Sequence, residues 1–192
     1  MRSKSFFIVF LVMVFLGLGL FYFIRFGFYP VAFVNTAIVS ARHLDQAVDS
    51  VRHYYSQAAE TYSPAGTIEA TPGVVREIRR ATLDKLIENV LIYQELKTRV
   101  GSDFEDIVEN KIMSLKLNTP NFEKAIATLY GLDLERFKKV VLKPQAQEEI
   151  LEGRLTLENT DFKKWLEDKR RGASIIILAT DLYWDGGKVA VK

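Results

Sequence analysis

The sequence predicts a mainly α-helical protein in which an N-terminal transmembrane helix precedes a multi-helix domain with a small antiparallel β-sheet. Three observations predict this class. Residues 6–24 are a run of nineteen residues without a charge, apolar residues recur every three or four positions between 41 and 172, and residues 173–192 place a glycine-rich turn between β-branched and apolar runs. We therefore expect an anchor over residues 1–25 and one domain over residues 26–192, with a β-hairpin in 173–192.

The apolar run is long enough to cross a bilayer, because nineteen helical residues extend about 28 Å. A cleavable signal peptide is the alternative, but such peptides usually have a shorter apolar core and a small-x-small cleavage site close behind it. The nearest such site, Val39-Ser40-Ala41, lies far from the apolar end, and the chain has no cysteine to carry a lipoprotein's acyl chain. These features favour an uncleaved anchor, with Phe26, Phe28 and Tyr29 in the interfacial aromatic belt.

The basic residues that flank the run indicate its orientation. Arg2 and Lys4 precede it, whereas Arg25 alone follows it until Arg42. The positive-inside tendency then puts the N-terminus in the cytoplasm and the domain outside the cytoplasmic membrane.

The domain's composition excludes several functions. Residues 26–192 carry 23 Lys and Arg against 24 Asp and Glu, a net charge of −1, so no nucleic-acid partner is indicated. The absence of cysteine excludes disulfides, thiol catalysis and thiolate metal sites.

The first half of the domain is predicted as one strand and two long helices. Val31 to Asn35 is a short strand-like run, and Ser40 caps a helix that begins near Ala41. Residues 61–73 are a predicted loop containing two prolines, and Thr71-Pro72 opens the next helix as cap and first-turn proline. Gly101 is well placed to end that helix.

The remaining helices are predicted from their start signals. Ser102 to Glu105 has the pattern of a capping box, in which the two side chains satisfy each other's backbone amides. Pro144 should break or kink a helix because it has no amide hydrogen. The other predicted starts and stops are Thr119-Pro120, Gly131, Asp133, Thr160 and Gly172.

The character of the chain changes after Gly172. Residues 174–180 are rich in β-branched side chains, and Asp185-Gly186-Gly187 separates two apolar runs, which is typical of a hairpin. We expect the strand near Val31 to pair with this hairpin and so tie the two ends of the domain together.

No residue pattern indicates catalysis, a cofactor or a metal. His43 and His53 lie ten residues apart on one predicted helix, whereas helical metal ligands are three or four apart. The acidic residues at 103, 105, 106 and 109 are explained as the start of a helix, where negative charge complements the dipole. The sequence has no phosphate-binding glycine loop, nucleophile elbow or zinc signature.

Aromatic residues are abundant along the domain. Most are expected in the core, as aromatics at helical spacing usually are. If several line a groove, they would form an adaptable apolar surface for extended or unfolded peptide. The candidate binding residues are Tyr54, Tyr55, Tyr130 and Phe137.

Three stretches carry a resemblance to a known family. Val31-Ala32-Phe33-Val34-Asn35 resembles a first strand that ends in Val-Asn, residues 83–95 (LDKLIENVLIYQE) resemble a leucine-rich "LDxLIxxxLLxQE" helix, and residues 122–137 resemble a "FExAL…GLTLEEF" element. In this order they resemble the N-terminal chaperone domain of the SurA, PpiD and PrsA group of extracytoplasmic folding factors, over residues 31–152. The resemblance implies binding of unfolded or exported polypeptides.

Two departures from that family matter. The enzymes of the group carry a parvulin prolyl-isomerase domain after the helical region, but residues 156–192 are too short for one and contain no histidine. Thr36 follows Asn35 where the family usually has glycine, so the first turn should differ.

The sequence therefore predicts a membrane-anchored, periplasmic-type holdase without a catalytic domain. A structural or scaffolding subunit of a cell-envelope membrane complex is the alternative, with one fixed partner in place of many clients.

Overall fold

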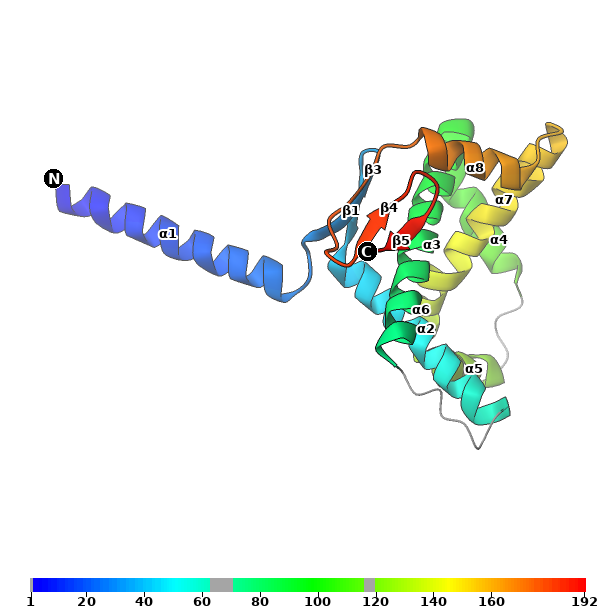
Figure 1. Ribbon diagram of the computed structural model, residues 1–192, viewed down its shortest axis with the longest axis horizontal. Coiled ribbons are helices and arrows are strands. Elements are labelled where there is room, and N and C mark those ends of the chain that lie inside the picture. Colours follow the sequence, from blue (N-terminus) through cyan, green and yellow to red (C-terminus); the bar gives the residue numbers. More distant parts are fainter. Residues whose placement is uncertain (1, 63–70, 116–119) are drawn as a thin grey trace.

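The computed structural model describes residues 2–62, 71–115 and 120–192, with all of their side chains except those of residues 2–9, 20, 61, 62 and 120. Helix α1 (Arg2–Arg25) projects alone from a helical domain, on the side of strands β1 and β3 (Figure 1). Its described side chains are all exposed. Within the described ranges, however, no helix is long and apolar enough to cross a membrane. The described helices therefore do not support the prediction that residues 6–24 form a transmembrane helix.

The domain is mainly α-helical with a small antiparallel sheet, as predicted. The sheet has three strands in the order β2-β1-β3, formed by Pro30–Val34 (β1), Ala37–Ser40 (β2) and Ile175–Ile177 (β3). Val34 pairs with Ile175 and Ala32 with Ile177, so the two ends of the domain are tied together as expected.

The composition of the sheet differs from the prediction. The hairpin Leu182–Trp184 (β4) and Val189–Val191 (β5) forms a separate two-stranded sheet, and β3 takes the place beside β1. The sequence analysis missed β2 altogether, because four residues are too few to show a period. The turn inside the hairpin is as predicted: Asp185 Oδ1 accepts hydrogen bonds from the amides of Gly187 and Lys188 at 3.0 and 2.8 Å.

Asn35 forms the corner between β1 and β2. Its φ is +53°, a left-handed value that asparagine tolerates better than most residues. Its backbone N–H donates to the Ser174 carbonyl at 2.8 Å, and its side chain accepts from the Ser174 amide at 3.0 Å and donates to Gln94 at 2.7 Å. Thr36 has no positive φ, so a β-branched residue fits where glycine was expected.

Seven α-helices follow α1 in the described chain. They are α2 (Ala41–Tyr62), α3 (Pro72–Val100), α4 (Phe104–Ser114), α5 (Pro120–Tyr130), α6 (Leu134–Phe137), α7 (Lys143–Leu157) and α8 (Phe162–Gly172).

Most predicted helix ends are confirmed. Ser40 Oγ accepts from the His43 amide at 3.3 Å, Thr71 Oγ1 from the Val74 amide at 3.4 Å, and Asp133 Oδ1 from the Arg136 amide at 2.8 Å. Helix α3 ends at Val100 with Gly101 as its C-terminal cap, and α8 ends at Gly172, also as predicted. Most of the predicted 61–73 loop, and the predicted cap Thr119, lie outside the described residues.

Two predicted caps are wrong. Gly101–Asp103 forms a 3₁₀ turn, so α4 begins one residue later than the capping box requires, and Ser102 Oγ donates to Asp103 instead. At the start of α8, Asp161 rather than Thr160 is the cap, because its carboxylate accepts from the Lys164 amide at 2.8 Å.

Pro144 does not break the helix, but the helix is irregular just before it. The five residues before α7, Lys138–Leu142, form a π-helix, in which the Lys143 amide bonds to the Lys138 carbonyl. The wider turn accommodates the missing amide of Pro144, which then occupies the first turn of α7.

The core has two apolar clusters joined by α3. Leu83, Leu86, Ile87 and Leu91 pack in the first, with the inner face of the sheet and the start of α2. Ile92 and Leu96 begin the second, which gathers α4 to α8. Because α3 spans 29 residues, about 43 Å, a single helix serves both clusters.

Candidate functional site

The four candidate aromatic residues lie in one continuous row at the end of α2. The ring centroids of Tyr55 and Tyr54 are 5.8 Å apart, those of Tyr54 and Tyr130 are 5.2 Å apart, and those of Tyr130 and Phe137 are 5.0 Å apart. Phe122 extends the series, 6.2 Å from Phe137. We call these five residues the aromatic row. It joins α2 to α5 and α6, which lie far from α2 in the sequence.

Exposure along the row falls from solvent to core. Tyr55 and Tyr54 are 49% and 39% exposed, Tyr130 is half-buried, and Phe137 is 7% exposed within the second core cluster. The buried end fixes the rings, and the exposed end presents rigid aromatic faces with phenolic hydroxyls. Such groups bind apolar and extended chains with little loss of side-chain entropy.

His53 holds the helices that carry the row. Its Nε2 lies 3.0 Å from the Thr128 carbonyl oxygen of α5, and since a carbonyl only accepts, Nε2 carries the hydrogen. Gly131 ends α5 with φ +65°, and a Cβ placed there would lie 3.2 Å from the His53 ring. His53 thus fits directly against the end of α5. His43 lies ten residues earlier, where burial, and then the charge of Lys139, lowers its pKa.

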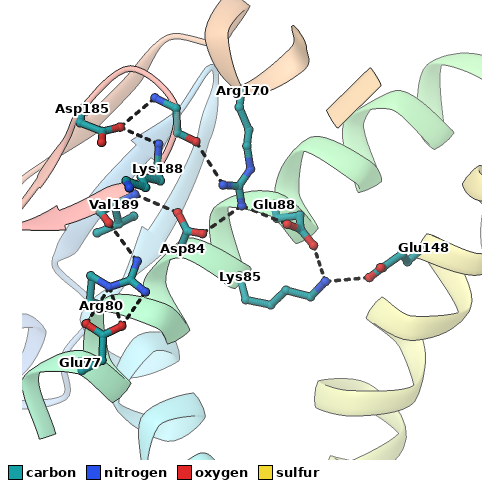
Figure 2. A network of polar contacts seen from close by, with 11 residues as sticks. Glu77, Arg80, Asp84, Lys85, Glu88, Glu148, Arg170, Asp185, Lys188 and Val189 are labelled. Carbon is teal, nitrogen blue, oxygen red and sulfur yellow. Dashed lines mark hydrogen bonds and ion pairs between the residues drawn. The ribbon is translucent and has the colours of Figure 1, made fainter. Parts of the chain in front are cut away.

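Apart from the aromatic row, a cluster of charged residues around Arg170 joins α3, α8 and the C-terminal hairpin (Figure 2). Arg170 of α8 donates through Nη2 to Asp84 at 3.1 Å and to Glu88 at 3.0 Å. Its Nη1 donates to the Gly187 carbonyl at 3.1 Å. The Arg170 side chain is only 13% exposed, so this ion pair is largely withdrawn from water.

The same centre fixes the last strand. Asp84 Oδ1 accepts from the Val189 amide at 2.8 Å, and Arg80 donates to the Val189 carbonyl at 3.0 Å (Figure 2). Glu77 orients Arg80 through paired hydrogen bonds of 2.9 and 2.7 Å. Asp84 belongs to the "LDxLI" stretch, and here its visible role is to bind the hairpin.

Ion pairs around Lys85 and Glu95 shift the pKa values of these two residues. Burial by itself favours a neutral Lys85, but hydrogen bonds to Glu148 and Glu88 outweigh it and raise the pKa of Lys85. Likewise, burial alone would raise the pKa of Glu95, yet Lys169 and Arg99, each at 2.6 Å, lower it below its ordinary value.

The described residues do not form a metal centre. In residues 2–62, 71–115 and 120–192, no group of three His, Asp or Glu side chains could hold an ion. Glu105, from the acidic start of α4, pairs instead with Lys143 at 2.6 Å.

The sequence analysis named four members of the aromatic row but missed its link to Phe122 and the whole Arg170 centre. Both depend on contacts between distant segments. Comparison with known proteins adds nothing to the assignment: no protein-family model, no curated protein and no solved structure matches this chain.

Proposed function

We propose that this protein is a membrane-anchored extracytoplasmic holdase that binds unfolded or exported polypeptides through the aromatic row. The observation that carries the proposal is the row itself. Its outer rings, Tyr54 and Tyr55, are exposed, while Tyr130 and Phe137 anchor them in the core. A surface of this kind recognises apolar side chains without reading a particular sequence.

The aromatic row suits a client that has not folded. Its rings present apolar area to solvent, and unfolded chains expose the apolar side chains that native proteins bury. The phenolic hydroxyls of Tyr54 and Tyr55 offer hydrogen bonds to a client's backbone, whose groups are unpaired before folding.

The membrane tether rests on the sequence of residues 6–24, which carry no charge over nineteen positions. Basic residues at 2 and 4 favour a cytoplasmic N-terminus, so the domain would face the outside of the cytoplasmic membrane. A tether raises the effective concentration of the row where exported chains emerge.

The direct test is suppression of aggregation by the full chain in lipid nanodiscs, with a chemically denatured client diluted into the same buffer. The variant carries Tyr54→Ser and Tyr55→Ser. The matched control is Tyr183→Ser, which removes a tyrosine of similar exposure, 43%, from β4. We expect the double variant to lose most of the suppression and the control to retain it.

Equal activity of the double variant and the wild type would refute the role of the row. Failure of the wild type to suppress aggregation of any client would refute the holdase. The dedicated-subunit alternative has its own signature. A photoreactive residue at Tyr55 would then capture one membrane protein in stoichiometric amount, whereas a holdase captures many exported proteins.

A further inference from the structure

The outer face of the three-stranded sheet is apolar. Phe33 of β1 pairs directly with Ile38 of β2 and with Ile176 of β3, so the three side chains lie in one line across the sheet. Ile38 is 61% exposed and Ile176 is 55% exposed. Their neighbours Val39, Ile175 and Ile177 point the other way and pack in the first core cluster. We call Phe33, Ile38 and Ile176 the outer stripe.

Such a face is unusual for a small antiparallel sheet. When one face of such a sheet covers the core, the other face normally carries polar side chains in contact with water. Here the outer face carries apolar side chains as well, at Phe33, Ile38 and Ile176. An apolar face of this kind marks a contact surface.

The outer stripe lies next to the point where α1 enters the domain. Only Phe26 to Tyr29 separate α1 from β1, and Phe26, Phe28 and Tyr29 are all exposed. Figure 1 shows α1 leaving the domain from the side of β1 and β3, away from the helices that cover the inner face of the sheet. A membrane crossed by α1 would therefore face the outer stripe.

The connection between α1 and the sheet is held by hydrogen bonds. The Arg42 amide donates to the Gly27 carbonyl at 2.8 Å, and the Ala41 amide donates to the Tyr29 carbonyl at 2.9 Å. The Arg42 guanidinium also lies 5.3 Å from the centre of the Phe28 ring. The domain therefore meets α1 through a bonded junction and not through a free linker. Exposed Arg25 and Arg42 place positive charge at this junction, which suits lipid phosphates.

We propose that the outer stripe, together with Phe28 and Tyr29, rests in the lipid headgroup region, so that the domain lies against the bilayer with the sheet facing the lipid. This inference rests on the proposed membrane tether. The occupant is the lipid surface, because only four residues separate α1 from β1 and this junction carries exposed aromatic and basic residues. One consequence is that the aromatic row, whose inner members Phe122, Tyr130 and Phe137 pack with the second core cluster, lies away from the bilayer.

Lipid-borne quenching tests the proposal on the full chain. The protein has no cysteine, so single-cysteine variants can be labelled with bimane and reconstituted into vesicles of phosphatidylethanolamine and phosphatidylglycerol. A nitroxide near the top of the acyl chain serves as quencher. The labelled variants are Ile38→Cys and Ile176→Cys, with Phe10→Cys in α1 as the membrane reference. Leu157→Cys, 86% exposed at the end of α7, is the aqueous reference.

We expect quenching at positions 38 and 176 at least roughly threefold stronger than at 157, as for groups buried about 5–10 Å into the interface. Aqueous iodide should give the reverse order. If the label at position 10 is quenched while the labels at 38 and 176 are quenched no more than the label at 157, the inference is wrong and the tether stands. If the label at position 10 also escapes quenching, the tether itself fails. Self-quenching between labels at 38 on neighbouring copies would assign the stripe to a second copy of this chain and would also overturn the proposal.

Discussion

Replacing Arg170 by methionine tests how much the polar centre of Figure 2 contributes to stability. Methionine keeps most of the apolar stem and removes the charge, so the loss reports the ion pairs and not the packing. Two carboxylates, Asp84 and Glu88, would lose a partner at 3.1 and 3.0 Å, and the Gly187 carbonyl would lose its donor.

The expected loss is about 3 kcal/mol, the low end of the range for breaking a buried ion pair. The low end applies because Asp84 keeps the Val189 amide and Glu88 keeps Lys85. A loss of this size lowers Tm by about 6–12 °C in a domain of this length.

Urea denaturation of the full chain in mild detergent measures the effect. The chain has two tryptophans, Trp165 in α8 and Trp184 in β4, so fluorescence reports both elements that Arg170 joins. The matched control is Arg171→Met, which changes the same residue type at an exposed neighbouring position. If Arg170→Met stays within about 0.5 kcal/mol of this control, as exposed substitutions usually do, the centre does not stabilise the fold.

Three further predictions concern local features. Asn35→Ala should lower the free energy of unfolding by about 3 kcal/mol and Asn35→Gly by about 2 kcal/mol. Both variants lose the side-chain hydrogen bonds, but only alanine also has to adopt the left-handed φ at a cost. Equal losses in urea denaturation would exclude a backbone contribution. Glu95→Gln should make the free energy of unfolding less sensitive to acid below about pH 4.5. Burial alone would raise the pKa of Glu95, but hydrogen bonds from Lys169 and Arg99 lower it. The ionised carboxylate therefore stabilises the fold above its unfolded pKa, and this contribution is lost as pH falls through the folded pKa. An unchanged acid limb in thermal melts from pH 7 to 3 would contradict this. Gly131→Ala should lower Tm by about 3–6 °C through the His53 contact and the positive φ, whereas Gly153→Ala, in open space within α7, should leave Tm equal or higher; a similar drop in both variants would refute the contact.

The parts of the fold that depend on neighbouring residues could be predicted from the sequence. Ser40, Thr71 and Asp133 cap their helices through bonds to amides three residues away, so the pattern contains the whole interaction. Where two candidates compete locally, the pattern is insufficient. Thr160 and Asp161 are both residue types that can cap α8. Asp161 is the cap, because the Thr160 amide donates to the Leu155 carbonyl at the end of α7.

Pairing between distant segments could not be predicted in detail. The β-branched run near 175 was recognised as strand-like, but its place beside β1 depends on Asn35 contacts that no local pattern contains. The aromatic row shows the same division. Tyr54 and Tyr55 were identifiable as unusual residues, whereas the convergence of α2, α5 and α6 that unites them with Phe137 is a property of the packing. Binding of clients by the row stays a prediction.

The pairing of β1 with β3 has a consequence for synthesis of the chain. Asn35 and Ser174 are 139 residues apart, so β1 has no second neighbouring strand until that much more of the chain has been made. At ordinary translation rates that interval lasts roughly 7 to 30 seconds. Throughout it, one edge of β1 offers unpaired amides and carbonyls to any strand nearby. The nascent chain is therefore open to wrong strand pairing at this edge until residues 175–177 have been made.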